Sequence, residues 1–111
     1  MKVINIKTLD DCLDRVVTKE FVFDQPTYRA WIMALGELGQ VEYYSHFPRP
    51  FYRVTQQGVL SIKGVEGRDR CQVLYFHYTS ETESTLVQRL HRLNQAASLI
   101  GGMGGEVRRV E

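Results

Sequence analysis

The sequence has little cysteine and no strong excess of charge of either sign. Its 111 residues include two cysteines, Cys12 and Cys71, and neither belongs to a CxxC pair. A small secreted domain usually carries a denser, even-numbered set of cysteines, so we expect two free thiols in a reducing compartment. The net charge is only +1. This argues against a chain built mainly to bind polyanions, although it leaves room for a local basic patch.

Long apolar runs are also missing. No stretch approaches the roughly 20 apolar residues of a membrane-spanning helix, and the first residues lack the apolar segment of a signal peptide. Hydrophobic residues make up 43% and charged residues 24%, which is typical of a globular chain and excludes disorder. We therefore expect a single cytoplasmic domain over residues 1–111 that does not contact a membrane.

The common catalytic motifs are absent as well. The sequence has no GxSxG, HExxH, P-loop or dinucleotide-binding fingerprint, and its three histidines are scattered singly. His46 and His77 lie on predicted strands and could meet, but a metal ion would need a third ligand such as Cys71 or Glu42. We predict no metal, no cofactor and no catalytic residue. A small enzyme is therefore a less favoured hypothesis than a binding protein.

The first forty residues predict alternating strands and helices. Strands are expected over 3–6 and 19–23. A helix is expected between them, because Thr8 and Asp11 have the spacing of a capping box and apolar residues follow at helical intervals up to Val17. A second helix is expected from Pro26, in its first turn, to Gly39, with an apolar stripe from Tyr28 to Leu38 and a cap at Asp24 or Gln25.

The rest of the chain predicts a β-meander, a long helix and a closing strand. The meander strands are expected over 41–47, 51–55, 59–63 and 71–78, and the last is expected to be central because it is almost continuously apolar. The helix begins at Ser80 with Glu83 three residues on. Its apolar stripe comprises Leu86, Leu90, Leu93, Ala97 and Ile100. Gly101 and Gly102 are expected to end it, and a strand is expected over 106–110.

These elements predict an α+β protein. From residue 19 onward the order is β-α-β-β(-β)-α-β, which indicates a two-layer sandwich of ferredoxin-like type with two helices on one face of an antiparallel sheet. The first strand and helix would be an N-terminal β-α extension. The alternative is a three-layer or barrel-like α+β fold in which the meander curls.

The most distinctive segment spans residues 43–65, which contain no acidic side chain and many aromatic rings. Arginine interleaved with aromatic residues suits single-stranded nucleic acid, whose bases stack on rings while guanidinium groups hold phosphate. The same residue types are enriched in protein interfaces. A core sheet with a basic rim would also explain the composition. The candidate binding residues are Tyr44, Phe47, Arg49, Phe51, Tyr52 and Arg53.

Pro48-Arg49-Pro50 interrupts this segment, because proline cannot donate to a β-ladder. We expect a bulge or a protruding loop there. Arg49 would stand at a rigid tip, which favours recognition because little entropy is lost on binding. The alternative is an edge-strand guard, in which proline and charge block unwanted pairing.

The leading functional hypothesis is a non-catalytic module that forms a homodimer and contacts a protein partner or small ligand through the meander. A single-stranded nucleic-acid-binding protein is the second hypothesis. The third is a small enzyme or ligand carrier with an aromatic pocket lined by Trp31, Tyr75 or Tyr78.

Overall fold

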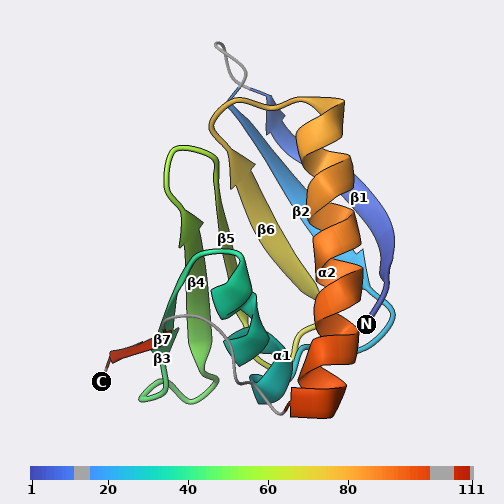
Figure 1. Ribbon diagram of the computed structural model, residues 1–111. Coiled ribbons are helices and arrows are strands. Elements are labelled where there is room, and N and C mark those ends of the chain that lie inside the picture. The colour runs from blue at the N-terminus through green and yellow to red at the C-terminus, as the bar shows by residue number, and fades with distance from the viewer. Residues whose placement is uncertain (12–15, 101–106, 111) are drawn as a thin grey trace.

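Alternating apolar residues produce seven strands that form one sheet in the order β1-β2-β6-β5-β4-β3-β7 (Figure 1). The computed structural model describes residues 1–11, 16–100 and 107–110. Neighbouring strands are antiparallel, apart from the parallel pair of β3 and β7. The elements are β1 (Val3–Asp11), β2 (Val17–Phe23), α1 (Arg29–Ala34), the 3-10 helix η2 (Leu35–Glu37), β3 (Gln40–Tyr44), β4 (Phe51–Gln56), β5 (Leu60–Val65), β6 (Arg70–Tyr75), α2 (Ser80–Ile100) and β7 (Val107–Val110).

The predicted meander is confirmed as four consecutive antiparallel strands, β3 to β6, with ends that differ from the prediction by at most three residues. Short turns join them. The β5–β6 turn contains Gly67 at φ +91°, a left-handed conformation that side chains with a Cβ rarely adopt. The strand β6 lies inside the sheet, between β2 and β5, as its apolar sequence predicted.

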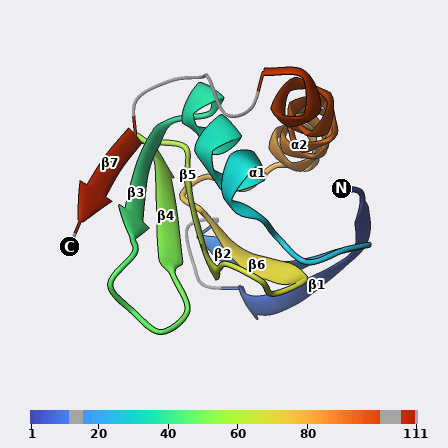
Figure 2. The same cartoon turned by 90° about the horizontal axis from the view of Figure 1, so that it is seen from below.

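The α+β class is confirmed, but the ferredoxin-like order is wrong. In that order the first strand of the repeat would lie inside the sheet, next to the last one. Here β1 and β6 occupy both sides of β2, so β7 pairs instead with β3 at the opposite edge. The segment with α1 takes the chain from β2 to β3, which lies near the other end of the sheet. The meander then runs back strand by strand until β6 pairs with β2 (Figure 2).

The helix predicted from Thr8 is also wrong. Residues 8–11 continue β1, which forms a hairpin with β2, and Val17 begins β2. The predicted residues Cys12 and Leu13 lie outside the described residues. Pairing along β2 supplies more hydrogen bonds than an isolated short helix would, so tertiary context overrides the helical spacing.

The second helix begins later than predicted. Residues 24–28 precede it, and Tyr28 is extended at φ −133° and ψ 161°. Pro26 therefore lies before α1 and not in its first turn. The reason lies in Thr27, whose backbone N–H donates to the Arg68 carbonyl while its own carbonyl accepts from the Gly67 N–H. These bonds hold the chain extended, and after Ala34 the helix tightens into η2.

The long helix is confirmed, and Leu86, Leu90 and Leu93 of its apolar stripe are buried. Its cap is Thr79 and not Ser80, because the Thr82 N–H donates to Thr79 Oγ1 at 3.0 Å. The predicted stop at Gly101 and Gly102 lies outside the described residues. The closing strand is confirmed as β7.

Both helices lie on the same side of a sheet that bends around them (Figure 2). The helices and the curved sheet therefore form two layers. Large buried side chains fill the space between helices and sheet, and the largest include Trp31, Tyr43, Tyr52, Tyr75 and Phe21. Among the described residues, no helix lies on the other side of the sheet. This side holds the candidate site.

Candidate functional site

The side of the sheet without helices is here called the outer face, and strand register arranges its side chains in three rows. Side chains alternate across a strand, so the neighbours of core residues point outward. The charged row consists of Glu42, Arg53, Lys63, Gln72, Glu20 and Lys7. The aromatic row consists of Tyr44, Phe51 and Val65. The polar row consists of Gln40, Thr55, Ser61, Leu74 and Thr18.

A hollow of about 700 Å³ lies in the outer face and is open to solvent. Side chains from all three rows line it, together with Arg68 and Arg70 at the β5–β6 turn. Its volume lies within the range of small-molecule sites, although such sites are usually more enclosed. The hollow is therefore a broad, shallow surface that a ligand could cover.

Two of the cations that line the hollow stand directly opposite each other on neighbouring strands. Arg53 of β4 pairs in register with Lys63 of β5, and both side chains are exposed. Like charges at directly opposed positions destabilise a sheet. Neither side chain forms an ion pair with any residue in the described parts of the chain, and the same is true of Arg68. The hollow thus presents three cations that form no ion pair in that region. Glu42 pairs in register with Arg53, and Arg68 contributes to the lowered pKa of Asp69.

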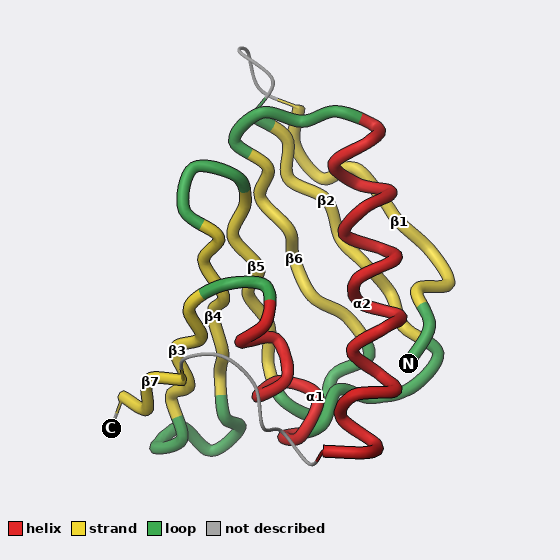
Figure 3. Tube along the Cα trace, in the orientation of Figure 1, coloured by secondary structure: helices red, strands yellow, loops and turns green. Residues whose placement is uncertain are grey.

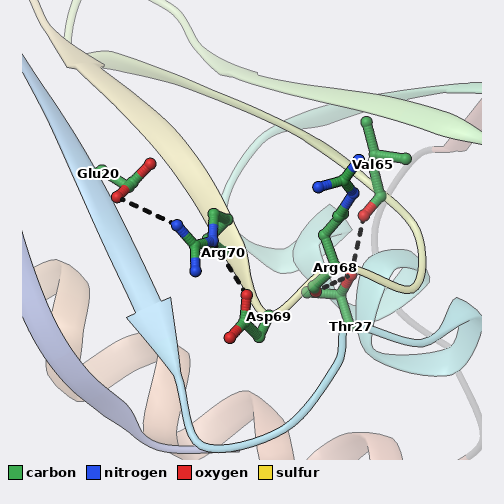
Figure 4. Close-up of polar contacts among 6 residues, drawn as sticks. All are labelled: Glu20, Thr27, Val65, Arg68, Asp69 and Arg70. Carbon is green, nitrogen blue, oxygen red and sulfur yellow. Dashed lines mark hydrogen bonds and ion pairs between the residues drawn. The ribbon is translucent and has the colours of Figure 1, made fainter.

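The nearby acids are engaged elsewhere. Arg70 takes two of them: its Nε donates to Asp69 Oδ1 at 3.0 Å, and its Nη1 lies 3.7 Å from Glu20 Oε1 (Figure 4). The bond between Arg70 and Asp69 lowers the pKa of that carboxyl and raises the pKa of the guanidinium. Glu42 Oε2 accepts a bond of 3.0 Å from the Tyr44 hydroxyl.

Glu66, in the turn beside Arg68, faces the other side of the sheet. Its Oε1 accepts a bond of 2.7 Å from the hydroxyl of Tyr43, which is a core residue. The pKa of the Tyr43 hydroxyl is raised mainly by burial, and this bond to Glu66 raises it further. Arg29 Nε donates to the same hydroxyl at 3.2 Å. Glu66 is therefore held away from the three cations.

Thr27 fixes the turn that carries Arg68. It is the buried polar residue of the described core, and its Oγ1 lies 3.2 Å from the Val65 carbonyl and 3.0 Å from the Arg68 carbonyl (Figure 4). The hydroxyl and both backbone groups of Thr27 thus hold residues 65–68. Arg68 stands at the rim of the hollow on a turn that is anchored to the segment before α1.

Four of the six predicted binding residues lie close to one another. The rings of Tyr44 and Phe51 lie 5.1 Å apart, and those of Tyr44 and Phe47 lie 6.4 Å apart. Arg53 follows Phe51 by two positions on the same face of β4. Arg49 is exposed in the loop between β3 and β4 (Figure 3).

Tyr52 cannot belong to a surface site, because its side chain is fully buried on the helix-covered side. Burial raises the pKa of its hydroxyl well above the ordinary value. The sequence alone could have shown this, since Tyr52 lies between Phe51 and Arg53 and neighbours in a strand face opposite sides.

The predicted site also omits Lys63, Arg68 and Arg70. The turn between β4 and β5 spans residues 57–59 and sets the register that places Lys63 opposite Arg53. A two-residue turn at Gln57 and Gly58 would place Ile62 there instead, so the sequence did not reveal this pair. Arg68 comes from a loop and Arg70 from the start of the next strand. No pattern along the chain links them to the aromatic cluster, which here means the rings of Tyr44, Phe47 and Phe51. Their proximity depends on the way β6 pairs with β5 and β2.

Pro48 and Pro50 lie in a loop, as predicted, because β3 ends at Tyr44 and β4 begins at Phe51 (Figure 3). The edge-guard interpretation does not fit, since both strands have neighbours on each side. His46 and Phe47 stack in this loop with ring centroids 4.4 Å apart.

A second polar cluster joins β2 to the first turn of α2. Lys19 Nζ lies 2.9 Å from Glu83 Oε1 and donates to the Tyr78 hydroxyl at 2.9 Å. Burial lowers the pKa of Lys19, but the bonds to Tyr78 and Glu83 outweigh it and the net shift is upward. The cluster connects helix to sheet.

The proposed lining of an aromatic pocket lies within the core. Trp31 and Tyr75 are fully buried, and the Tyr75 ring packs edge-on against Tyr78 at 5.1 Å. Trp31 and Tyr75 are members of the hydrophobic core, and Tyr78 packs against it. Among the described residues, no three His, Cys, Asp or Glu side chains form a group that could hold a metal ion. Cys71 is a buried free thiol.

The chain matches no protein-family model, no curated protein and no solved structure. Within the described residues, no helix is long and apolar enough to span a membrane. A function for this protein is therefore inferred from the geometry of the outer face.

Proposed function

We propose that this protein is a non-catalytic binding module that holds an anionic partner on the outer face of its sheet. The observation that supports this most directly is the Arg53–Lys63 pair, which lines an open hollow and forms no ion pair with an acidic side chain of the described residues. Nearby acids are paired with Arg70, Tyr43 or Tyr44.

The charge arrangement suits binding better than folding. Opposed cations cost stability, and alternating charges at these positions would be more favourable for the sheet. An anion that lies across β4 and β5 would offset the repulsion, since strands are roughly 4.8 Å apart and both side chains reach the same region. Guanidinium and ammonium groups are the usual protein donors to phosphate and carboxylate.

A second copy of the chain is a poor occupant of this face. A symmetric dimer places the same patch of each subunit against the other, so the cationic rows would face each other. The predicted homodimer would therefore use another surface.

Inorganic tripolyphosphate is a suitable first probe, with binding followed by NMR of the labelled protein. We expect shift changes confined to the amides around Arg53, Lys63 and Arg68. R53Q/K63Q should remove them. The matched control is K2Q/R92Q, which loses the same charge at exposed positions outside the hollow and should bind normally. Shifts spread over the whole surface, or equal loss in both variants, would refute the proposal.

A further inference from the structure

We infer that the anionic partner is single-stranded nucleic acid, with bases on the aromatic cluster and phosphates on the cations of the hollow. This inference rests on the proposed function and adds the chemical class of the partner. It follows from the order of the rows on the outer face, in which the aromatic row lies next to the charged row and the polar row follows.

The aromatic cluster offers surfaces for stacking. Phe47 is 47% exposed, and its ring centroid lies 6.4 Å from that of Tyr44 and 4.4 Å from that of His46. Phe51, half-buried, extends the cluster into the hollow and lies 5.1 Å from Tyr44. Bases stack on such rings with little regard to sequence, because every base has a π-face.

The cations follow at the distance that a nucleotide requires. Arg53 comes two residues after Phe51 on the same face of β4, a separation of about 7 Å along the strand. A base on the aromatic row therefore leaves its own phosphate near the charged row. Lys63 lies opposite Arg53 on the neighbouring strand β5, and Arg68 lines the same hollow.

The outer face suits a phosphate backbone better than a protein partner. The core of a protein interface is poor in charged residues. Here the charged row lies between the aromatic and polar rows, and the hollow is lined by the cations Arg53, Lys63, Arg68 and Arg70. Thr18 and Ser61, beyond the charged row, add hydroxyl groups that can bond to sugar or phosphate oxygens.

The small number of cations sets the expected strength of binding. Three phosphate contacts give a slope of about −2 for log K against log salt on a single strand. The net charge of +1 adds little general attraction, so binding should depend on this face alone.

The experiment measures fluorescence anisotropy of labelled oligo(dT) and oligo(rU) of about 12 nucleotides, between about 50 and 200 mM salt. We expect R53Q/K63Q to weaken binding at least tenfold and to flatten the salt slope. F47A, which alters an exposed ring, should weaken binding at least fivefold with the slope unchanged. K2Q/R92Q should stay within twofold of the unaltered chain. Thermal unfolding by circular dichroism shows whether each variant is folded.

Three results would overturn the inference. If tripolyphosphate binds the hollow but neither oligonucleotide binds at tens of micromolar, the nucleic-acid assignment fails while the proposed function stands. If a mononucleotide competes as well as an oligonucleotide, the partner is not a strand. If folded R53Q/K63Q binds oligonucleotides normally, the hollow is not the binding site. Failure of every anion to bind would refute the proposed function itself.

Discussion

Tyr52 and Gly64 stand opposite each other on β4 and β5, and the ring of Tyr52 fills the space that a side chain at position 64 would need. A Cβ atom on Gly64 would lie 2.5 Å from the Tyr52 hydroxyl oxygen and 2.7 Å from its Cζ. Tyr52 is fully buried, so its ring has little room to move. The glycine thus allows a large ring to cover the sheet just beneath the outer face.

Replacing Gly64 with alanine should therefore destabilise the protein, although alanine is normally the better strand residue. Overpacking of a filled core costs about 1–3 kcal/mol. Chemical denaturation measures the change. S61A, on the outer face of the same strand, is the control and should change the free energy of unfolding by less than about 0.5 kcal/mol. An increase in stability for G64A would show that the ring of Tyr52 moves aside easily.

Replacing Thr27 with valine should loosen the turn that carries Arg68. The change keeps the shape but removes the hydroxyl that serves the Val65 and Arg68 carbonyls. Loss of a buried hydrogen-bonding group costs about 1–3 kcal/mol. We expect lower stability in urea and weaker binding of tripolyphosphate, while T27S should retain both properties. If T27V is destabilised but binds tripolyphosphate normally, the turn does not position the binding site.

Lys19 should contribute stability that is lost in alkaline solution. Its pKa is raised in the folded protein, so the folded state holds this proton more tightly than the unfolded state. The contribution is complete below the ordinary pKa of lysine and fades as pH rises through the raised value. We expect K19M to be less stable near neutral pH, with the difference from the unaltered chain shrinking above about pH 10. A difference that stays constant with pH would contradict this.

Self-association should use the edge of β1 rather than the outer face. This strand carries Ile4 and Leu9, which are 62% and 43% exposed and lie where the register with β2 shifts. Exposed apolar side chains on an edge strand favour pairing between chains. We predict a dimer at micromolar concentration that I4E/L9E converts to a species of 12.9 kDa in sedimentation. A single 12.9 kDa species for the unaltered chain would refute the prediction.

The meander and the long helix could be predicted because their signals are local. Pro48 and Gly58 mark the turns, and Leu86, Leu90 and Leu93 repeat at helical spacing. The first helix was mispredicted because the apolar residues after Thr8 also suit a strand, and the choice depends on pairing with β2. Strand order could not be predicted from such signals, since it depends on which edge β7 joins.

The sequence predicted the candidate site only where its residues lie close together along the chain. Tyr44, Phe47, Phe51 and Arg53 come from one stretch, and local composition identified them. Arg68 is held in place by a hydrogen bond from Thr27, which lies more than forty residues away in sequence. Local composition does not reveal such a contact. The pairing of nearby acids with Arg70 and Tyr43 likewise requires the fold.

The β4–β5 and β5–β6 hairpins place most of the hollow within residues 51–75. Contacts between residues that are close in sequence form quickly, since little loop entropy is lost. The hollow can therefore take shape before α2 closes over the opposite side of the sheet. Because the outward positions of these strands alternate with core positions, the chemistry of the outer face can change through substitutions at every second residue while the core sequence stays intact.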